Sequence, residues 1–320
     1  MDNTMCRRFD TLRNYFPDDL NSHTSKDIND LGSIKNYCSN GESGETNCKT
    51  YLDKINAGFL WLFDQLFVKN QISDINIAEY IIIWLSYMLN LKKESEITKL
   101  NDFYSNYIEI NTHYTNCNND RGDCSKSLKE ITGYTNYKEI IDKKKELFNI
   151  DFEYMSKFYD AFKTLCNMYT EIDANDKNNK NYLDCAKKFV EKYNELNDPN
   201  NTKDNAYYQV LSTLSNYYNN FKNFCESITI DCSDIPLLPD IKTTQISEQS
   251  FETSSELSSK VTPSSSSVTN KLIPVLSIIV AIPIFLGIFY KVNNKEFINY
   301  FFDYLYANIK KYIICLPFLY

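Results

Sequence analysis

The sequence predicts an all-α protein with a disulfide-containing helical N-terminal domain, a disordered Ser/Thr-rich stalk, a single transmembrane helix and a short C-terminal tail. Apolar residues recur at intervals of three and four over six segments, the period of an α-helix. Only 7 Gly and 8 Pro leave few turns for a many-stranded sandwich or barrel. One run near the C-terminus is apolar enough to span a bilayer. We expect boundaries at 1–235, 236–271, 272–290 and 291–320.

Three helices are predicted in the first half of the domain. Residues 48–68 carry apolar side chains on one face, which is typical of an amphipathic helix. Residues 75–91 are apolar on almost every side, and their charge-free stretch is too short for a membrane span, so we expect a central core helix. Residues 99–110 repeat the amphipathic pattern with Leu100, Phe103 and Tyr107.

Three further helices are predicted after residue 137. A long helix is expected over 138–171, where aromatic and apolar residues form one stripe from Phe148 to Tyr169. Shorter helices are expected over 185–199 and 206–224. Stripes of Tyr and Phe at this spacing are typical of core packing rather than of a ligand-binding face.

The C-terminal third changes character twice. Residues 241–270 hold fifteen Ser or Thr, a composition that predicts a flexible stalk, either O-glycosylated or a bare tether. Residues 272–290 are uncharged and flanked by lysines, and as a helix they span about 28 Å, the thickness of a membrane core. The tail after residue 290 is richer in lysine than the adjoining stalk, so we expect it in the cytosol and the N-terminal domain outside.

Ten cysteines, nine of them before residue 233, favour an oxidising compartment. None has the close spacing of a zinc site. Spacing suggests four disulfides, namely Cys38 with Cys48, Cys117 with Cys124, Cys166 with Cys185, and Cys225 with Cys232. The pair Cys166 and Cys185 has geometric support, because an antiparallel helical hairpin brings the two together. The other pairings are hypotheses, since eight cysteines can pair in 105 ways, and Cys6 is left over.

Residue patterns for catalysis, cofactors and nucleic acid are not found. No phosphate-binding glycine loop, no nucleophile elbow and no zinc-protease motif occurs. The two histidines, His23 and His113, lie in polar segments without a nucleophile nearby. A net charge of −8 without a basic stripe disfavours a nucleic-acid partner. We therefore expect no catalytic residue, no cofactor, no metal and no small-molecule substrate.

Arg121, Gly122 and Asp123 form the tripeptide RGD between Cys117 and Cys124. A small closed loop of this kind can present the tripeptide to an adhesion receptor. A tripeptide is also common in ordinary surface turns, so RGD stays a weak adhesion candidate.

Several segments together resemble the PIR multigene family of malaria parasites, in particular its Cir/Bir/Yir-type rodent-parasite members. They are CRRFDTLRNYFPDDL at 6–20, NYCSN at 36–40, YLDKINAGFLWLFDQLF at 51–67, IIIWLSYMLNL at 81–91, FYDAFKTLC at 158–166, KNFC at 222–225 and KLIPVLSIIVAIPIFLGIFYK at 271–291. The resemblance implies a helical domain with disulfides, a Ser/Thr-rich hinge, one membrane span and export to the infected-cell or parasite surface. It also implies a variant antigen involved in immune evasion or adhesion. The tail departs from the family's strongly basic pattern, because residues 292–320 are mixed in charge and end in an apolar stretch.

Two functions from different classes follow from these observations. The first is a membrane-anchored variant antigen that displays its helical domain to a host receptor or antibody, without catalysis. The second is an exported, membrane-tethered organiser whose domain faces the host cytosol and binds a host protein there. Oxidised cysteines favour the first and reduced cysteines the second.

Overall fold

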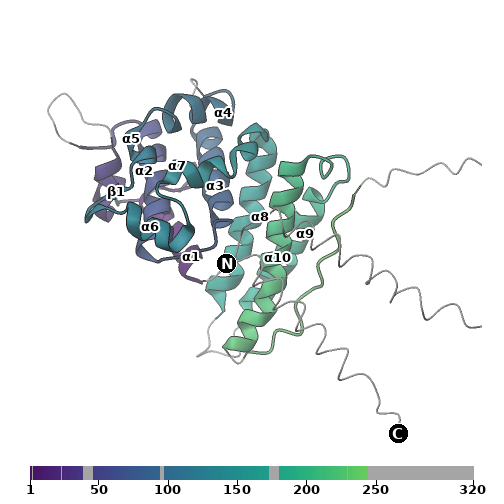
Figure 1. Cartoon of the computed structure of the whole chain (residues 1–320). Helices are drawn as coiled ribbons and strands as arrows, with labels where there is room; N and C mark the ends of the chain where they lie inside the picture. Colours follow the sequence, from purple (N-terminus) through teal and green to yellow (C-terminus); the bar gives the residue numbers. More distant parts are fainter. Residues whose placement is uncertain are drawn as a thin grey trace, which may run out of the picture. The chain divides into compact units, whose positions relative to one another are not determined.

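The first group of helices lies in the N-terminal half of the chain (Figure 1). The computed structural model describes residues 1, 3–22, 24–38, 46–93, 97–172, 180–228 and 230–243. This group comprises α1 (Asn3–Tyr15), the 3₁₀ turns η1 (Ile28–Asp30) and η2 (Gly32–Tyr37), α2 (Tyr51–Phe63), the π-helical turn η3 (Asp64–Lys69), α3 (Ile77–Lys92), α4 (Leu100–Phe103), the π-helical turn η4 (Tyr104–Ile108), α5 (Thr112–Thr115), α6 (Ser125–Thr132) and α7 (Tyr137–Asp142).

The second group contains the 3₁₀ turn η5 (Lys145–Asn149), α8 (Phe152–Glu171), α9 (Asn181–Leu196) and α10 (Asn205–Ser227). Figure 1 shows α8, α9 and α10 running side by side. Helix α8 joins the two groups, because it packs against α1 and α3 on one side and α9 and α10 on the other. One hydrophobic core therefore runs through both groups.

Local sequence explains where the two central helices begin and what they bury. Thr50 caps α2: its hydroxyl accepts the Asp53 N–H at 3.0 Å, and the Asp53 carboxylate accepts the Thr50 N–H at 3.2 Å. Helix α3 is buried along nearly its whole length, from Ile77 to Leu89. Its burial on all sides agrees with the apolar sequence, which had predicted a central core helix.

The predicted helix over 138–171 is wrong as a single helix. The structure divides it into α7, η5 and α8. Leu147 and Phe148 are buried, and the tighter η5 turn places both in the core. Asp151 then adopts an extended backbone conformation as the residue before α8, and its side chain makes no capping hydrogen bond.

The other expected helices are present with shifted ends, and several elements were not expected. The segment 48–68 becomes α2 followed by η3, and 99–110 becomes α4 followed by η4. Helices α1 and α6 and a short antiparallel hairpin, β1 (Asn118–Asn119) with β2 (Gly122–Asp123), had not been predicted. Helix α1 was not predicted because most of its residues are polar, although Met5, Cys6, Phe9 and Leu12 form a buried face.

The end of the described chain folds back over α9 and α10 as the C-terminal strap, defined as residues 230–243. The hydroxyls of Tyr182 and Tyr218 donate to the carbonyls of Asp231 and Pro236, at 3.2 and 2.8 Å. The Asn197 amide donates to the Asp240 carbonyl at 2.8 Å. Residues 236–243, expected to begin the stalk, thus lie against the helical domain.

Within the ranges that the structure covers, none of the helices combines the length and apolar character of a membrane span. The predicted transmembrane helix over 272–290, the tail and nearly all of the stalk lie outside the described residues.

Candidate interaction surface

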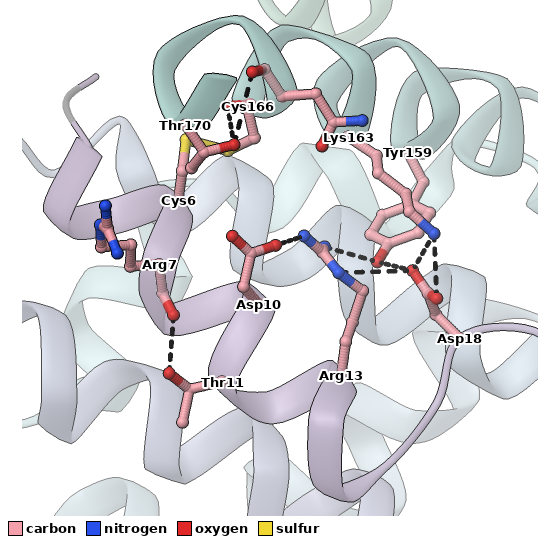
Figure 2. A network of polar contacts seen from close by, with 11 residues as sticks. Cys6, Arg7, Asp10, Thr11, Arg13, Asp18, Tyr159, Lys163, Cys166 and Thr170 are labelled. Carbon is pink, nitrogen blue, oxygen red and sulfur yellow. Dashed lines mark hydrogen bonds and ion pairs between the residues drawn. A yellow bond between two sulfur atoms is a disulfide. The ribbon is translucent and has the colours of Figure 1, made fainter. Parts of the chain in front are cut away.

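A buried carboxylate fixes the loop that follows α1. The Asp18 side chain is only 6% exposed. It accepts a hydrogen bond from the Tyr159 hydroxyl at 2.6 Å and two from the Lys163 ammonium at 2.9 and 3.0 Å, and the Arg13 guanidinium lies 4.0 Å away (Figure 2). Burial raises the pKa of Tyr159; the Arg13 guanidinium opposes this rise and the Asp18 carboxylate adds to it, so the Tyr159 hydroxyl stays protonated and remains a donor. We call these four residues the Asp18 network.

The main chain of the same loop is also held. The Tyr87 hydroxyl on α3 donates to the Asp18 carbonyl at 2.9 Å. Tyr87 and Tyr159 stack with ring centroids 4.2 Å apart, so the loop rests on a pair of packed aromatic rings from α3 and α8. The loop therefore has a defined position relative to both helices.

This loop forms one wall of a surface hollow of 740 Å³. We call it the Lys92 hollow and define it by six of its lining residues, Phe16, Leu20, Lys26, Tyr51, Lys54 and Lys92. Leu20 is 61% exposed and Tyr51 is 54% exposed, although both are large and apolar. The volume lies within the range of about 300–1,000 Å³ that is usual for ligand sites.

In the Lys92 hollow, lysine ammonium groups lie over aromatic rings. The Lys92 ammonium lies 5.4 Å from the Phe16 ring centroid and 5.2 Å from that of Tyr51. The Lys26 ammonium lies 5.0 Å from the Tyr15 ring. Partial burial lowers the pKa of Lys92, which means that its charge is incompletely solvated. The arrangement is suited to a partner that brings both negative charge and apolar surface.

Four disulfides join eight of the described cysteines. Three are local and pair the cysteines that spacing had suggested: Cys38 with Cys48, Cys117 with Cys124, and Cys225 with Cys232. The fourth, Cys6–Cys166, links α1 to α8 across 160 residues of sequence (Figure 2).

The predicted pair Cys166–Cys185 is therefore wrong. Cys166 lies on the α8 face that packs against α1, where it and Cys6 are both buried. Cys185 lies half-buried on α9 and is the free cysteine among the described residues. Helices α8 and α9 do form the expected hairpin, but the two cysteines occupy different faces of it. Cys315 lies outside the described residues.

The RGD tripeptide lies on the β1–β2 hairpin, which is closed by Cys117–Cys124. Arg121, Gly122 and Asp123 are all exposed. The Asp123 carboxylate accepts the Ser125 N–H at 2.8 Å, and this hydrogen bond lowers the pKa of Asp123. The hairpin is held from below by the Asn119 amide, which donates to the buried Asp64 carboxylate at 2.9 Å. One oxygen of Asp123 is thus engaged in starting α6.

A metal-binding cluster is not evident in the described chain. No group of three His, Cys, Asp or Glu side chains in it could hold a metal ion. His113 packs edge-on against Tyr37, and burial lowers the pKa of His113. His23 lies outside the described residues.

Sequence reasoning missed the Lys92 hollow because its residues come from separate segments. Lys26 follows α1, Lys54 lies on α2 and Lys92 ends α3. The available signal was the segment FPDD at 16–19, where a Pro turn directly follows an amphipathic stretch.

Comparisons with known proteins agree with the fold. A family model described as Plasmodium variant antigen protein Cir/Yir/Bir matches residues 6–291. A solved structure, described as that of a Plasmodium PIR protein ectodomain, is 33% identical with a TM-score of 0.52, and the match covers 76% of this chain and 99% of that chain. A search of curated proteins finds no match.

Proposed function

Because the chain belongs to the Plasmodium variant antigen family Cir/Yir/Bir, we propose that it is a membrane-anchored surface antigen that displays its helical domain to the host. In this proposal residues 1–243 lie outside the membrane, residues 272–290 anchor them and the tail lies in the cytosol. The domain acts by being bound, through a receptor or an antibody, and not by catalysis.

The observation that carries this proposal is the set of four disulfides in the described domain. Disulfides persist in oxidising environments, so a domain with eight of nine described cysteines bridged suits the outside of a cell. The similarity to a solved PIR ectodomain supports the same side of the membrane.

The fold also suits variation at its surface. The core is continuous and built largely from Tyr, Phe, Leu and Ile, whereas the exposed helix faces are polar. Substitutions on these exposed faces change stability little, usually within about 0.5 kcal/mol. Surface residues can therefore change while the helices and disulfides remain.

Limited trypsin digestion of intact infected cells tests the proposal. We expect cleavage at Lys260 or Lys271, release of a folded fragment that begins near Met1, and faster migration of that fragment before reduction than after it. A variant in which Lys242, Lys260 and Lys271 are all changed to Ala is the control and should stay attached.

The opposite result supports the organiser that faces the host cytosol. In that case the domain resists trypsin until the cells are permeabilised, and its cysteines react with a thiol reagent without prior reduction. That pair of results would replace the display function.

A further inference from the structure

The Lys92 hollow concentrates positive charge that the protein itself neutralises only in part, through Asp18 near Lys92 and Asp27 near Lys54. Four lysines line it, Lys26, Lys54, Lys92 and Lys93. None of them forms an ion pair with a carboxylate of the described residues. The whole chain has a net charge of −8, so this local excess runs against its overall charge.

The two carboxylates in the same lining are occupied within their own turns. Asp19 accepts the Asn21 N–H at 2.8 Å. Asp27 accepts the Asn29 N–H at 2.9 Å, and this hydrogen bond is the main cause that lowers the pKa of Asp27. Both carboxylates keep their negative charge, and Asp27 also interacts with Lys54, but the lining still holds an excess of two positive charges.

Apolar surface lies directly between these charges. Phe16 and Tyr51 stack with centroids 6.4 Å apart, and Leu20 adds a largely exposed aliphatic side chain. A bound side chain that covers Leu20 and Tyr51 gains the free energy of burying apolar area, about 25 cal/mol per Å². A site that bound only through its lysines would not need the exposed side chains of Leu20 and Tyr51.

The hollow is also preformed. Its loop wall is fixed by the Asp18 network and by the Tyr87 hydroxyl, as described above. Its other walls belong to α2 and to the end of α3. A partner therefore binds without first ordering this surface, which removes one of the usual costs of association.

We propose that the Lys92 hollow binds an acidic segment of a partner protein, with an apolar side chain on Leu20 and Tyr51 and flanking carboxylates on the lysines. A sulfated polysaccharide fits less well, because it has no apolar side chain to cover the exposed Leu20 and Tyr51. This proposal depends on the display function in one respect only, namely that the partner is a host protein.

The test uses the purified full-length protein and a fluorescent synthetic peptide, DELWED, followed by anisotropy. We expect saturable binding that weakens as salt is raised, since exposed charge pairs are screened. A peptide with the same centre and lysine flanks, KKLWKK, and one with an acidic but polar sequence, DESSED, should both bind at least about tenfold more weakly.

Variants assign the binding to the hollow. The double variant Lys54→Glu with Lys92→Glu should weaken DELWED binding by about tenfold or more, and Leu20→Ser by up to about tenfold. The double variant Lys126→Glu with Lys129→Glu on α6, outside the hollow, is the matched control and should leave the affinity unchanged. These lysines and Leu20 are partly or fully exposed, and an unchanged thermal midpoint verifies the fold.

Three results overturn the proposal. They are no peptide binding, peptide binding that the Lys54→Glu and Lys92→Glu changes do not alter, or binding of heparin in place of the peptide. Because the experiment uses protein in solution, its failure leaves the surface-display experiment untouched, and failure of surface display leaves peptide binding testable.

Discussion

At the scale of single residues, the charges buried in this domain are few and each has a defined partner. Asp18 joins the loop after α1 to α8 through Tyr159 and Lys163. Glu79 on α3 accepts the Lys144 ammonium at 2.6 Å and the Gln209 amide at 2.7 Å. Asp64 holds the RGD hairpin through Asn119. Removing one partner leaves the other buried charge or donor unsatisfied, which is more costly than the pair is stabilising.

Asp18→Asn should lower the free energy of unfolding by about 2–3 kcal/mol. The variant keeps one acceptor for Tyr159 but removes the charge that Lys163 and Arg13 face. Urea unfolding of the full-length protein measures the change. Glu191→Gln on the exposed face of α9 is the control and should cost less than about 0.5 kcal/mol. Equal costs for the two variants would show that Asp18 does not hold the loop.

Asp64 should give the protein a distinct pH dependence. Burial raises the pKa of Asp64, while Asn119 and Lys69 oppose the change, so the folded chain holds this proton more tightly than the unfolded chain. The stabilising contribution is therefore full below the ordinary value of 3.8 and is lost as pH rises through the folded pKa. Asp64→Asn cannot ionise, so relative to wild type it should gain stability as pH rises from the ordinary value of 3.8 through the folded pKa of Asp64. Urea unfolding at several pH values measures this, and parallel curves for the two proteins would contradict it.

At the scale of elements, close helix packing in the first group depends on one glycine. Gly58 lies within α2, where a Cβ atom would stand 2.8 Å from Trp84 Cη2 on α3 and 3.4 Å from Leu12 Cδ2 on α1. A contact of 2.8 Å is too short for a Cβ atom, so an alanine here requires the Trp84 ring or the helices to shift. The absence of a side chain at Gly58 therefore sets how closely the three helices approach one another.

Gly58→Ala should destabilise the protein by about 1–2 kcal/mol. Overpacking costs about 1–3 kcal/mol, and the better helix propensity of alanine returns up to about 1 kcal/mol. Thermal and urea unfolding measure the effect. Adding Trp84→Phe, which removes the outer indole atoms, should cost less in the Gly58→Ala background than alone. Simple additivity of the two changes would mean that the contact does not set the spacing.

At the scale of the whole molecule, Cys6–Cys166 links α1 to α8 across a sequence separation of 160, whereas Cys117–Cys124 closes a loop with a sequence separation of only 7. In the chain-entropy description, stabilisation grows with the length of the closed loop. Changing both Cys6 and Cys166 to Ser should therefore cost about 4–5 kcal/mol, and changing Cys117 and Cys124 to Ser only about 2–3 kcal/mol. Unfolding in denaturant without reductant measures the loss of stability in the two double variants. The reverse order would mean that the local loop, and not the long link, limits stability.

The sequence was sufficient for the helical class and for the strongly periodic helices α2, α3, α8, α9 and α10. It was insufficient for α1, because the buried residues Met5, Phe9 and Leu12 are outnumbered by polar residues in that segment. It was also insufficient for η5, because this turn interrupts an apolar pattern that continues in the sequence. The three short disulfides follow from proximity in sequence, whereas Cys6–Cys166 depends on which face of α8 meets α1. The Lys92 hollow is made by tertiary folding and has no signature in a single segment.

The long covalent link from Cys6 to Cys166 has a consequence for biosynthesis. Chains emerge from the ribosome at about 5–20 residues per second, so Cys6 waits roughly 8 to 30 seconds before its partner exists. During that interval Cys38, Cys48, Cys117 and Cys124 have already appeared, and each can capture its thiol in a non-native bond. Correct maturation therefore requires either that the short loops oxidise first or that a thiol exchange catalyst resolves early mistakes.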